Sequence, residues 1–373
     1  MWRLRALSRH LSISVRSESG ATMVFIVVVL MGLLAMTAFV IDFGRIWQER
    51  RELQVGATAG ALAIAEDCAR SLCDAAYDEF NTGELYADAN ATDGAASALY
   101  IDLDLTNQTV HVVTATEDTA GGDTLDMLFA RIVGFDSITV GAEATVAWGA
   151  PFQLATIPII ISECEWLHPN EPEEDLADWS GWPGGGAYVL DEVPAPPSTT
   201  PYATILFHDG NTTEDCNAVA GQDADNDGRL AGGFGWLDTE GGCEAQLYDG
   251  WVDADPGASP STGCGPDELK GILLGDDPVL IPYFSDVEGL GAGGKYEVLD
   301  YGAFYVLGYN FGGQYKEFRT SVSMPTNPAM TEPPCGGDER CIAGWFVKWV
   351  QHGGSEIDPD GDGRGVSVIN LIG

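Results

Sequence analysis

One apolar run near the N-terminus constrains this chain more than any other feature. Residues 21–41 contain no Asp, Glu, Lys or Arg. As a helix, the run would rise roughly 32 Å at about 1.5 Å per residue, which matches the hydrocarbon core of a bilayer. A buried core helix of this length normally has a polar face, and this run has none. The run therefore predicts a single transmembrane helix over residues 21–42.

The segments on either side of the run suggest its orientation. The preceding tail, residues 1–20, carries Arg3, Arg5, Arg9 and Arg16, whereas the following flank mixes both signs of charge. Lys and Arg favour the cytoplasmic side. The acidic remainder holds all 8 cysteines, which fits an oxidising compartment. We expect a cytoplasmic tail, an anchor in the inner (cytoplasmic) membrane and an extracytoplasmic C-terminal region.

Two processing signals compete with a retained anchor. A cleaved signal peptide has an apolar core of about 7–15 residues followed closely by a small-x-small site. Here the nearest such site, Ala61-Leu62-Ala63, lies well beyond the run. A type IV prepilin signal would cut after Gly20 and place a Glu five positions later, where this chain has Phe25. The pattern favours an uncleaved anchor.

Charge limits the partners that the chain can bind. The formal net charge is −40, which excludes nucleic acid, because phosphates need Lys and Arg. The acidic surface either keeps the protein soluble or meets divalent cations or high salt, and both interpretations stay open. With 373 residues, of which 45% are hydrophobic, the chain can build a small membrane-proximal unit and one larger domain.

Residues 43–150 predict a helix followed by a small α+β unit. The helix continues out of the membrane over residues 43–72. It carries a stripe of small residues that allows another element to approach closely, packing either on this protein's own sheet or on a partner subunit. The stripe consists of Gly56, Ala57, Gly60 and Ala61. The other predicted elements are a hairpin over 98–113, an amphipathic helix over 124–133 that ends at Gly134, and a strand over 137–148.

Residues 151–373 predict a mainly-β domain with long loops, so the fold class of the whole chain is α+β. Apolar stretches recur between Gly- and Asp-rich loops, at 156–162, 203–207, 278–284, 303–309 and 343–350. The pairing of the cysteines stays open from the sequence. Cys243–Cys264 and Cys335–Cys341 are attractive as bridges within loops, and Cys68 and Cys73 either bridge the end of the helix or pair elsewhere.

The N-terminal patterns together resemble TadG-like proteins of the Flp (Tad) pilus-assembly group. The resemblance is carried by the Gly-Ala at Gly20–Ala21, the Asp-x-Gly-Arg at Asp42–Arg45, the Arg-rich, Ala-rich helix over 49–65 and the segments 128–140 and 142–149. It covers residues 1–150 and implies a single-pass inner-membrane protein of the Tad machinery. Its implied partners are other Tad components or pseudopilins, bound through the stripe of Gly56, Ala57, Gly60 and Ala61.

Some relatives in that group carry a von Willebrand A domain with an Asp-x-Ser-x-Ser metal site. The nearest sequence here, Asp178-Trp-Ser180-Gly-Trp182, lacks the second serine. The resemblance therefore does not imply adhesion by that route.

Two acidic loops predict calcium sites. Both fit Asp-x-Asp-x-Asp-Gly, with Asp223, Asp225 and Asp227 in one and Asp358, Asp360 and Asp362 in the other. Alternating carboxylates around a glycine turn supply the oxygens that calcium prefers. Neither loop completes an EF-hand, because Phe234 and Ile369 stand where a Glu is expected. The alternative is an ordinary turn in which Asp caps its own backbone.

Signatures of common enzymes are missing from the sequence. It contains no His-Glu-x-x-His, Gly-x-Ser-x-Gly or P-loop pattern, and His208 beside Asp209 fits a surface pair. We predict a non-enzymatic, membrane-anchored component of Tad/Flp pilus assembly or secretion. The alternatives are a calcium-dependent cell-surface adhesin not tied to pilus biogenesis and a secreted hydrolase with an unrecognised site.

Overall fold

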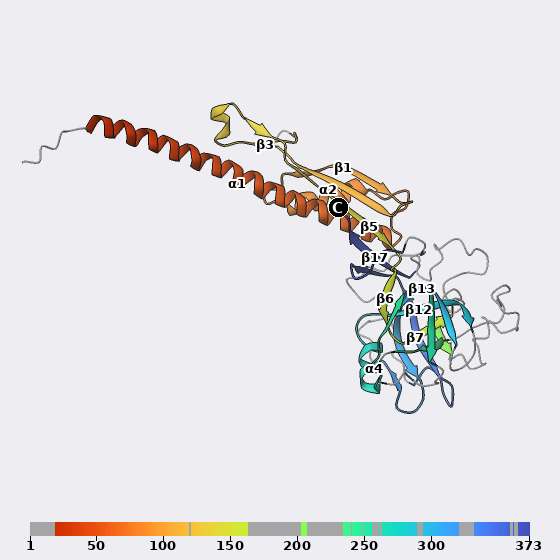
Figure 1. Ribbon diagram of the computed structural model, residues 1–373. Coiled ribbons are helices and arrows are strands. Elements are labelled where there is room, and N and C mark those ends of the chain that lie inside the picture. Colours follow the sequence, from red (N-terminus) through yellow and green to blue (C-terminus); the bar gives the residue numbers. More distant parts are fainter. Residues whose placement is uncertain are drawn as a thin grey trace, which may run out of the picture.

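The computed structural model describes most of the chain. The described residues are 19–118, 121–162, 203–206, 234–239, 241–248, 250–255, 260, 263–288, 294–320, 332–358, 361 and 365–373. Figure 1 shows one long helix reaching away from two groups of strands, one alongside the helix and one beyond its C-terminal end.

Helix α1 (Ser19–Ala69) is continuous over 51 residues, which corresponds to roughly 76 Å. Its residues 22–41 are largely exposed, whereas burial begins at Asp42 and becomes regular from Leu53 onward. The predicted transmembrane helix and the predicted helix that continues from it are therefore one element. It ends at Ala69, slightly before the expected residue 72.

Helices α1 and α2 (Glu79–Asn90) pack on a five-stranded sheet that we call the proximal sheet. Its order is β1-β2-β5-β17-β16, formed by β1 (Ala96–Asp104), β2 (Thr109–Thr116), β5 (Gly141–Gly149), β17 (Val366–Leu371) and β16 (Trp349–His352). Alternate residues of β2 and β5, including Val110, Val112, Ala144 and Val146, face α1 and are fully buried. The predicted hairpin is confirmed as β1 and β2.

The proximal sheet takes its last two strands from the C-terminal end of the chain. β17 lies antiparallel to β5, and β16 lies parallel to β17. These residues belong to the region 151–373, which the sequence predicts to be a separate mainly-β domain. The chain instead leaves the proximal sheet after β5, builds the second group of strands and returns, a long-range pairing that a local pattern does not reveal.

A short segment, which we call the excursion, connects β2 to β5. The predicted helix over 124–133 falls in this segment and is wrong. The excursion consists of β3 (Leu125–Asp126), the 3-10 turn η1 (Ala130–Val133) and β4 (Ser137–Ile138). β3 pairs with β4, and the Met127 amide donates to the Asp136 carbonyl at 2.9 Å. This hairpin pairing uses residues that the helix needed. Gly134 does end the turn, with φ +94°, a conformation that favours glycine.

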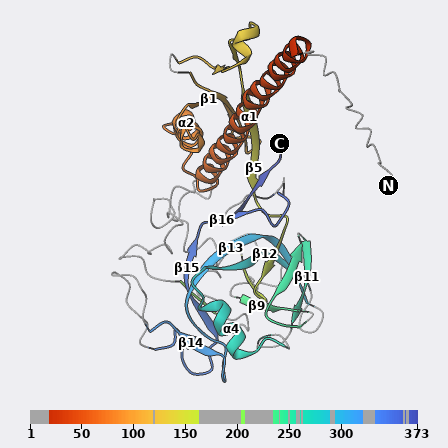
Figure 2. The same ribbon diagram turned by 90° about the vertical axis from the view of Figure 1, so that its left-hand side faces the viewer.

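The second group of strands, which we call the distal domain, closes on itself (Figure 2). Its sheet follows the order β11-β9-β7-β12-β13-β15-β8, and an additional pairing joins β11 to β13. The strands are β7 (Ile159–Ser162), β8 (Ala203–Leu206), β9 (Phe234–Leu237), β11 (Gly250–Asp255), β12 (Val279–Glu288), β13 (Lys295–Asn310), β14 (Lys316–Phe318), which pairs with β13, and β15 (Cys341–Val347). A two-stranded sheet of β6 (Gln153–Thr156) and β10 (Ala245–Tyr248) lies beside it.

Aromatic side chains fill the core of the distal domain. Trp236 stacks edge-on against Phe311, and helix α4 (Pro266–Leu273) adds Leu269 and Leu273 to the same cluster. Every apolar stretch predicted in this region contains strand residues, although 156–162 and 343–350 are each divided between two strands. The α+β class with a mainly-β domain is confirmed.

Disulfides join three pairs of cysteines within the described part of the chain. The two loop bridges suggested by the sequence, Cys243–Cys264 and Cys335–Cys341, are present, as is Cys68–Cys73. The remaining cysteines, 164 and 216, lie outside the described residues.

Candidate functional site

The apolar half of α1 has no protein around it. The apolar stretch of this helix has mean hydropathy 3.0 and is 0% buried within the protein. Large side chains such as Phe25, Leu30 and Phe39 are exposed. Water would solvate such a surface poorly, whereas lipid chains would cover it at no cost in backbone hydrogen bonds. This helix marks the chain as membrane-anchored.

Asp42 fixes the excursion to the end of the apolar run. Its carboxylate, only 5% exposed, accepts hydrogen bonds from the amides of Leu128, Phe129 and Ala130 at 2.6–3.3 Å. These amides open the 3-10 turn and have no partner within it. One turn along α1, the Arg45 guanidinium donates to the Asp126 carbonyl at 3.0 Å. The Asp-x-Gly-Arg pattern at 42–45 thus acts as a clamp, which we call the boundary clamp.

Two glutamates continue this attachment along α1. Glu49 is buried and accepts a short hydrogen bond from the Thr116 hydroxyl, and burial raises the pKa of this carboxyl. Glu52 accepts from the amide of Thr92 at 2.8 Å and from its hydroxyl at 2.7 Å. These hydrogen bonds, the one from the amide first, lower the pKa of Glu52. Each contact joins α1 to a residue far away in the sequence, so the helix and the proximal sheet form one packed unit.

The stripe of small residues is an internal packing surface. A Cβ added to Gly56 would lie 3.1 Å from the Cα of Ala87, and one added to Gly60 would lie 3.4 Å from the Cα of Gly83. α2 therefore crosses α1 at the glycines. Ala57 and Ala61 are fully buried in the cluster that joins α1 to β2 and β5. Packing within the protein is confirmed. The alternative of a partner subunit on this stripe is wrong, because its own chain fills the space.

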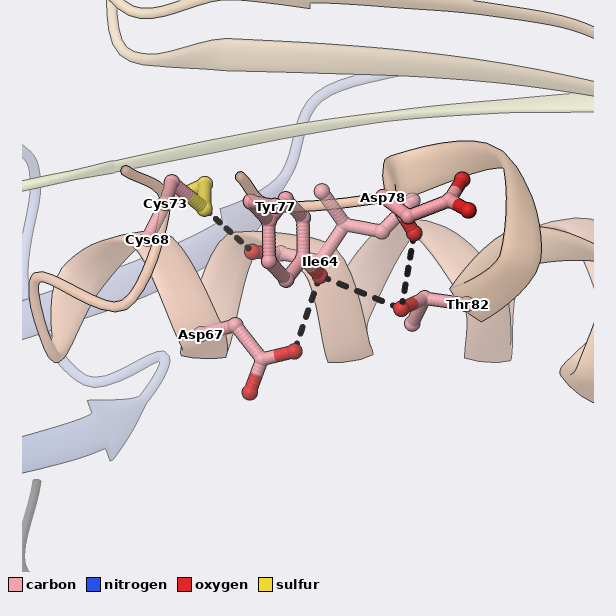
Figure 3. Close-up of a disulfide and its surroundings, with 7 residues drawn as sticks. All are labelled: Ile64, Asp67, Cys68, Cys73, Tyr77, Asp78 and Thr82. Carbon is pink, nitrogen blue, oxygen red and sulfur yellow. Dashed lines mark hydrogen bonds between the residues drawn. A yellow bond between two sulfur atoms is a disulfide. The ribbon is translucent and has the colours of Figure 1, made fainter. Parts of the chain in front are cut away.

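The C-terminal end of α1 is tied to the start of α2 (Figure 3). The Cys68–Cys73 disulfide closes the turn. The Tyr77 hydroxyl donates to Asp67 at 2.8 Å, and burial raises the pKa of this phenol. Asp78 caps α2 by accepting from the Asn81 amide at 3.0 Å. Together these contacts set the angle at which α2 returns along α1.

An exposed apolar face of α1 lies just beyond the membrane run. Phe43, Trp47 and Val55 are each more than half exposed, and the Arg51 guanidinium lies 5.0 Å from the centroid of the Trp47 ring. We call this the outer stripe. The predictions from the sequence did not include this surface. The spacing of four between Phe43, Trp47 and Arg51, with Val55 four further on, was the available signal.

Only one of the predicted calcium ligands falls within the described residues. The Asp358 amide donates to the Ala150 carbonyl at 2.8 Å, and the Gly361 amide donates to the Asp358 carbonyl at 3.4 Å. Both are backbone bonds, and both fit an ordinary turn. Asp223, Asp225, Asp227, Asp360 and Asp362 lie outside the described part. Within that part no group of three His, Cys, Asp or Glu side chains gathers. Calcium therefore stays a prediction.

The distal domain has an open hollow of about 320 Å³ beside the end of α4. Thr156, Glu244, Ile272, Asp276 and Asp277 contribute to its lining. Cys243, which also lines it, is held in a disulfide and is not a free nucleophile. His208 and Asp209 lie outside the described residues. The expectation of a non-enzymatic protein stays a prediction.

Comparison with known proteins bears on α1 alone. A family model described as putative Flp pilus-assembly TadE/G-like matches residues 20–66. That span includes the exposed apolar half of α1, the boundary clamp residues Asp42 and Arg45, and the packed stripe. No curated protein and no solved structure matches the chain. Residues 20–66 are therefore similar to the TadE/G-like segment of Flp pilus-assembly proteins, and the exposed apolar half of α1 within this span marks the chain as membrane-anchored.

Proposed function

We propose that this chain is a non-enzymatic component of Tad/Flp pilus assembly, with a cytoplasmic N-terminus and an acidic domain outside the inner membrane. One observation carries the proposal. The TadE/G-like match at residues 20–66 coincides with a helix whose first half is free of protein contacts and whose second half is packed into the body. Such a helix suits a subunit that must be held in the membrane while it presents a domain on one side.

The packing of α1 makes that presentation rigid. Three parts of the protein contact the same helix between Asp42 and Ala69: the proximal sheet, α2 and the segment that the boundary clamp holds. Glycine inside a helix costs about 1 kcal/mol relative to alanine. Gly56 and Gly60 nevertheless lie in the packed region of α1, where they face the backbone of α2. The distance between the membrane and the proximal sheet is therefore set by the helix and not by a linker.

The outer stripe is our proposed docking face for other Tad components. It adjoins the membrane run, so a partner helix that emerges from the same membrane would meet Phe43 and Trp47 first. The partner we propose is an apolar helix that carries an acidic residue near Arg50 and Arg51. Packing against an exposed indole is a common feature of interface hot spots, where Trp and Arg are enriched.

Site-specific photo-crosslinking in native membranes tests the proposal. A photoreactive phenylalanine analogue is placed at Trp47, and the matched control has it at Leu85, an exposed position on α2. We expect pilus subunits or other Tad proteins to be captured from Trp47 and not from Leu85. Capture of no such protein at Trp47, or equal capture at both positions, contradicts the proposed role and its docking face.

The second candidate, a calcium-dependent adhesin, is favoured by the two Asp-x-Asp-x-Asp-Gly loops in a chain of net charge −40. Extracellular calcium sites bind at roughly 10⁻⁴–10⁻³ M. At tenfold excess over that constant, a bound ion stabilises the fold by about 1.4 kcal/mol. Calcium should then raise the melting midpoint, and magnesium should raise it less. An unchanged midpoint removes the structural calcium role.

A further inference from the structure

The excursion that carries η1 exposes apolar side chains that the fold does not use. Ile132 is 81% exposed and Phe135 is 68% exposed. The exposed large apolar residues of this segment are Leu128, Phe129, Ile132, Phe135 and Ile138. Water-exposed apolar side chains gathered on one short segment mark a contact surface more often than scattered ones do.

The base of the same excursion is firmly held. Leu125 and Met127 are buried in a cluster with Leu53 of α1, and Val140 closes it on the other side. The boundary clamp then fixes the start of η1 through three backbone amides. The exposed tip is thus presented by a supported base, and its position along α1 is determined.

That position is the edge of the membrane. Asp42 is the first charged residue after the apolar run, and its carboxylate touches the amides that open η1. Figure 1 shows this turn beside α1, displaced from the proximal strands toward the N-terminal half of the helix. A bilayer that covers residues 21–41 therefore ends within about one helical turn of η1, where the head-group layer is roughly 5–8 Å deep.

We propose that the η1 turn is a second membrane contact, in which Leu128, Ile132 and Phe135 enter the head-group boundary of the leaflet on the side of the proximal sheet. The occupant of this surface is lipid, because the surface continues directly from the helix that the bilayer already surrounds. Interfacial segments insert apolar side chains about 5–10 Å into this layer. Asp126, Arg131 and Asp136 are exposed on the same excursion and would keep the contact at head-group depth.

Two attachment points would restrict how α1 tilts and rotates. A lone transmembrane helix is free to rotate about its axis, whereas a side contact selects one rotation. The proposed contact would therefore fix the rotation of α1 about its axis. The same face of the proximal sheet, together with the outer stripe, would then always point toward neighbouring proteins in the membrane. The inference rests on α1 spanning the membrane and does not require a role in pilus assembly.

Depth-dependent quenching in protein-free vesicles tests the inference. The full chain is reconstituted into phosphatidylethanolamine–phosphatidylglycerol vesicles and labelled without reductant with a thiol-reactive fluorophore at Ile132→Cys or Phe135→Cys. Leu85→Cys is the exposed control, Leu34→Cys is the transmembrane control, and the wild-type chain gives the labelling background. Lipids with nitroxide quenchers near the head group or near the chain end report the depth of each label.

We expect about twofold or more quenching at positions 132 and 135 compared with Leu85→Cys, strongest with the shallow quencher, as for side chains that lie at the interface. Adding Asp42→Asn, which removes the charged acceptor of the clamp, should reduce the quenching at Ile132→Cys but not at Leu34→Cys. Quenching at 132 and 135 equal to that at 85, with Leu34→Cys quenched by the deep lipid, overturns the inference alone. If neither lipid quenches Leu34→Cys, α1 does not span the membrane and the inference is wrong as well, whatever the photo-crosslinking result.

Discussion

The crossing of α1 and α2 at Gly60 leads to a prediction that separates internal packing from partner binding. The added Cβ of Gly60→Ala would lie 3.4 Å from the Cα of Gly83, 3.5 Å from its carbonyl oxygen and 3.8 Å from the Cβ of Tyr86. These are ordinary van der Waals contacts. Alanine should therefore fit and gain about 1 kcal/mol of helix propensity over glycine. We expect Gly60→Ala to melt at or slightly above the wild-type temperature.

Gly60→Leu should behave in the opposite way. Its further carbons enter space held by the backbone of α2, and overpacking of this kind costs about 1–3 kcal/mol, partly offset by propensity. The difference in unfolding free energy between the alanine and leucine variants should be about 1–3 kcal/mol, because the two residues differ little in helix propensity. For a unit of about 100–150 residues, at about 4 °C per kcal/mol, this corresponds to a gap in Tm of roughly 4–12 °C.

Gly44 supplies the matched control, because nothing lies within 4 Å of a Cβ added there. Gly44→Ala and Gly44→Leu should melt together, since the two residues differ little in helix propensity. The assay is thermal unfolding of the full chain in detergent micelles, followed by circular dichroism. Equal Tm values for Gly60→Ala and Gly60→Leu, accompanied by a change in association with other proteins, would refute the internal packing of the stripe.

Three further predictions concern the contacts around the proximal sheet. Replacing Cys68 and Cys73 by Ser should lower the unfolding free energy by about 2 kcal/mol in urea titrations, from the loop entropy of a bridge with sequence separation 5; an unchanged midpoint would contradict this. Burial raises the pKa of Glu49, so the folded chain binds this proton more tightly than the unfolded chain, and the stability that it contributes at low pH is lost as pH rises through the raised pKa. Glu49→Gln should therefore melt above the wild type at pH 8, with the gap closing toward pH 4, and a gap independent of pH would be inconsistent with that shift. Tyr77→Phe removes the hydrogen bond to Asp67 and should cost about 1 kcal/mol in the same titrations, whereas no measurable loss would show that the bond is not formed in solution.

Elements with a strong local signal were predictable from the sequence. The uncharged apolar run over 21–41 is long enough to predict a membrane-spanning helix, and α1 contains this run. The hairpin of β1 and β2 follows from period-two alternation with a turn between the strands. The small residues at 56, 57, 60 and 61 correctly indicated close packing. They did not identify the neighbour, because a smooth surface fits a sheet, a helix of the same chain or a helix of another.

Elements that depend on distant partners were not predictable. β16 and β17 join the proximal sheet more than two hundred residues after β5. The sequence of an apolar strand does not indicate which sheet the strand will join. The segment 124–133 has helical periodicity, yet β3 pairs with β4 and the boundary clamp captures the amides that follow. Asp42 was noticed as part of a motif, but its role depends on a loop more than eighty residues away.

The central claim is that one helix crosses the membrane and holds the acidic body outside the cell membrane. Its most direct test is thiol labelling of intact spheroplasts with a membrane-impermeant maleimide, using Ser8→Cys in the N-terminal tail and Leu85→Cys on α2. The account predicts that Leu85→Cys is labelled in intact spheroplasts and that Ser8→Cys is labelled only after the spheroplasts are permeabilised. Labelling of both sites in intact spheroplasts, or of Ser8→Cys alone, would contradict it.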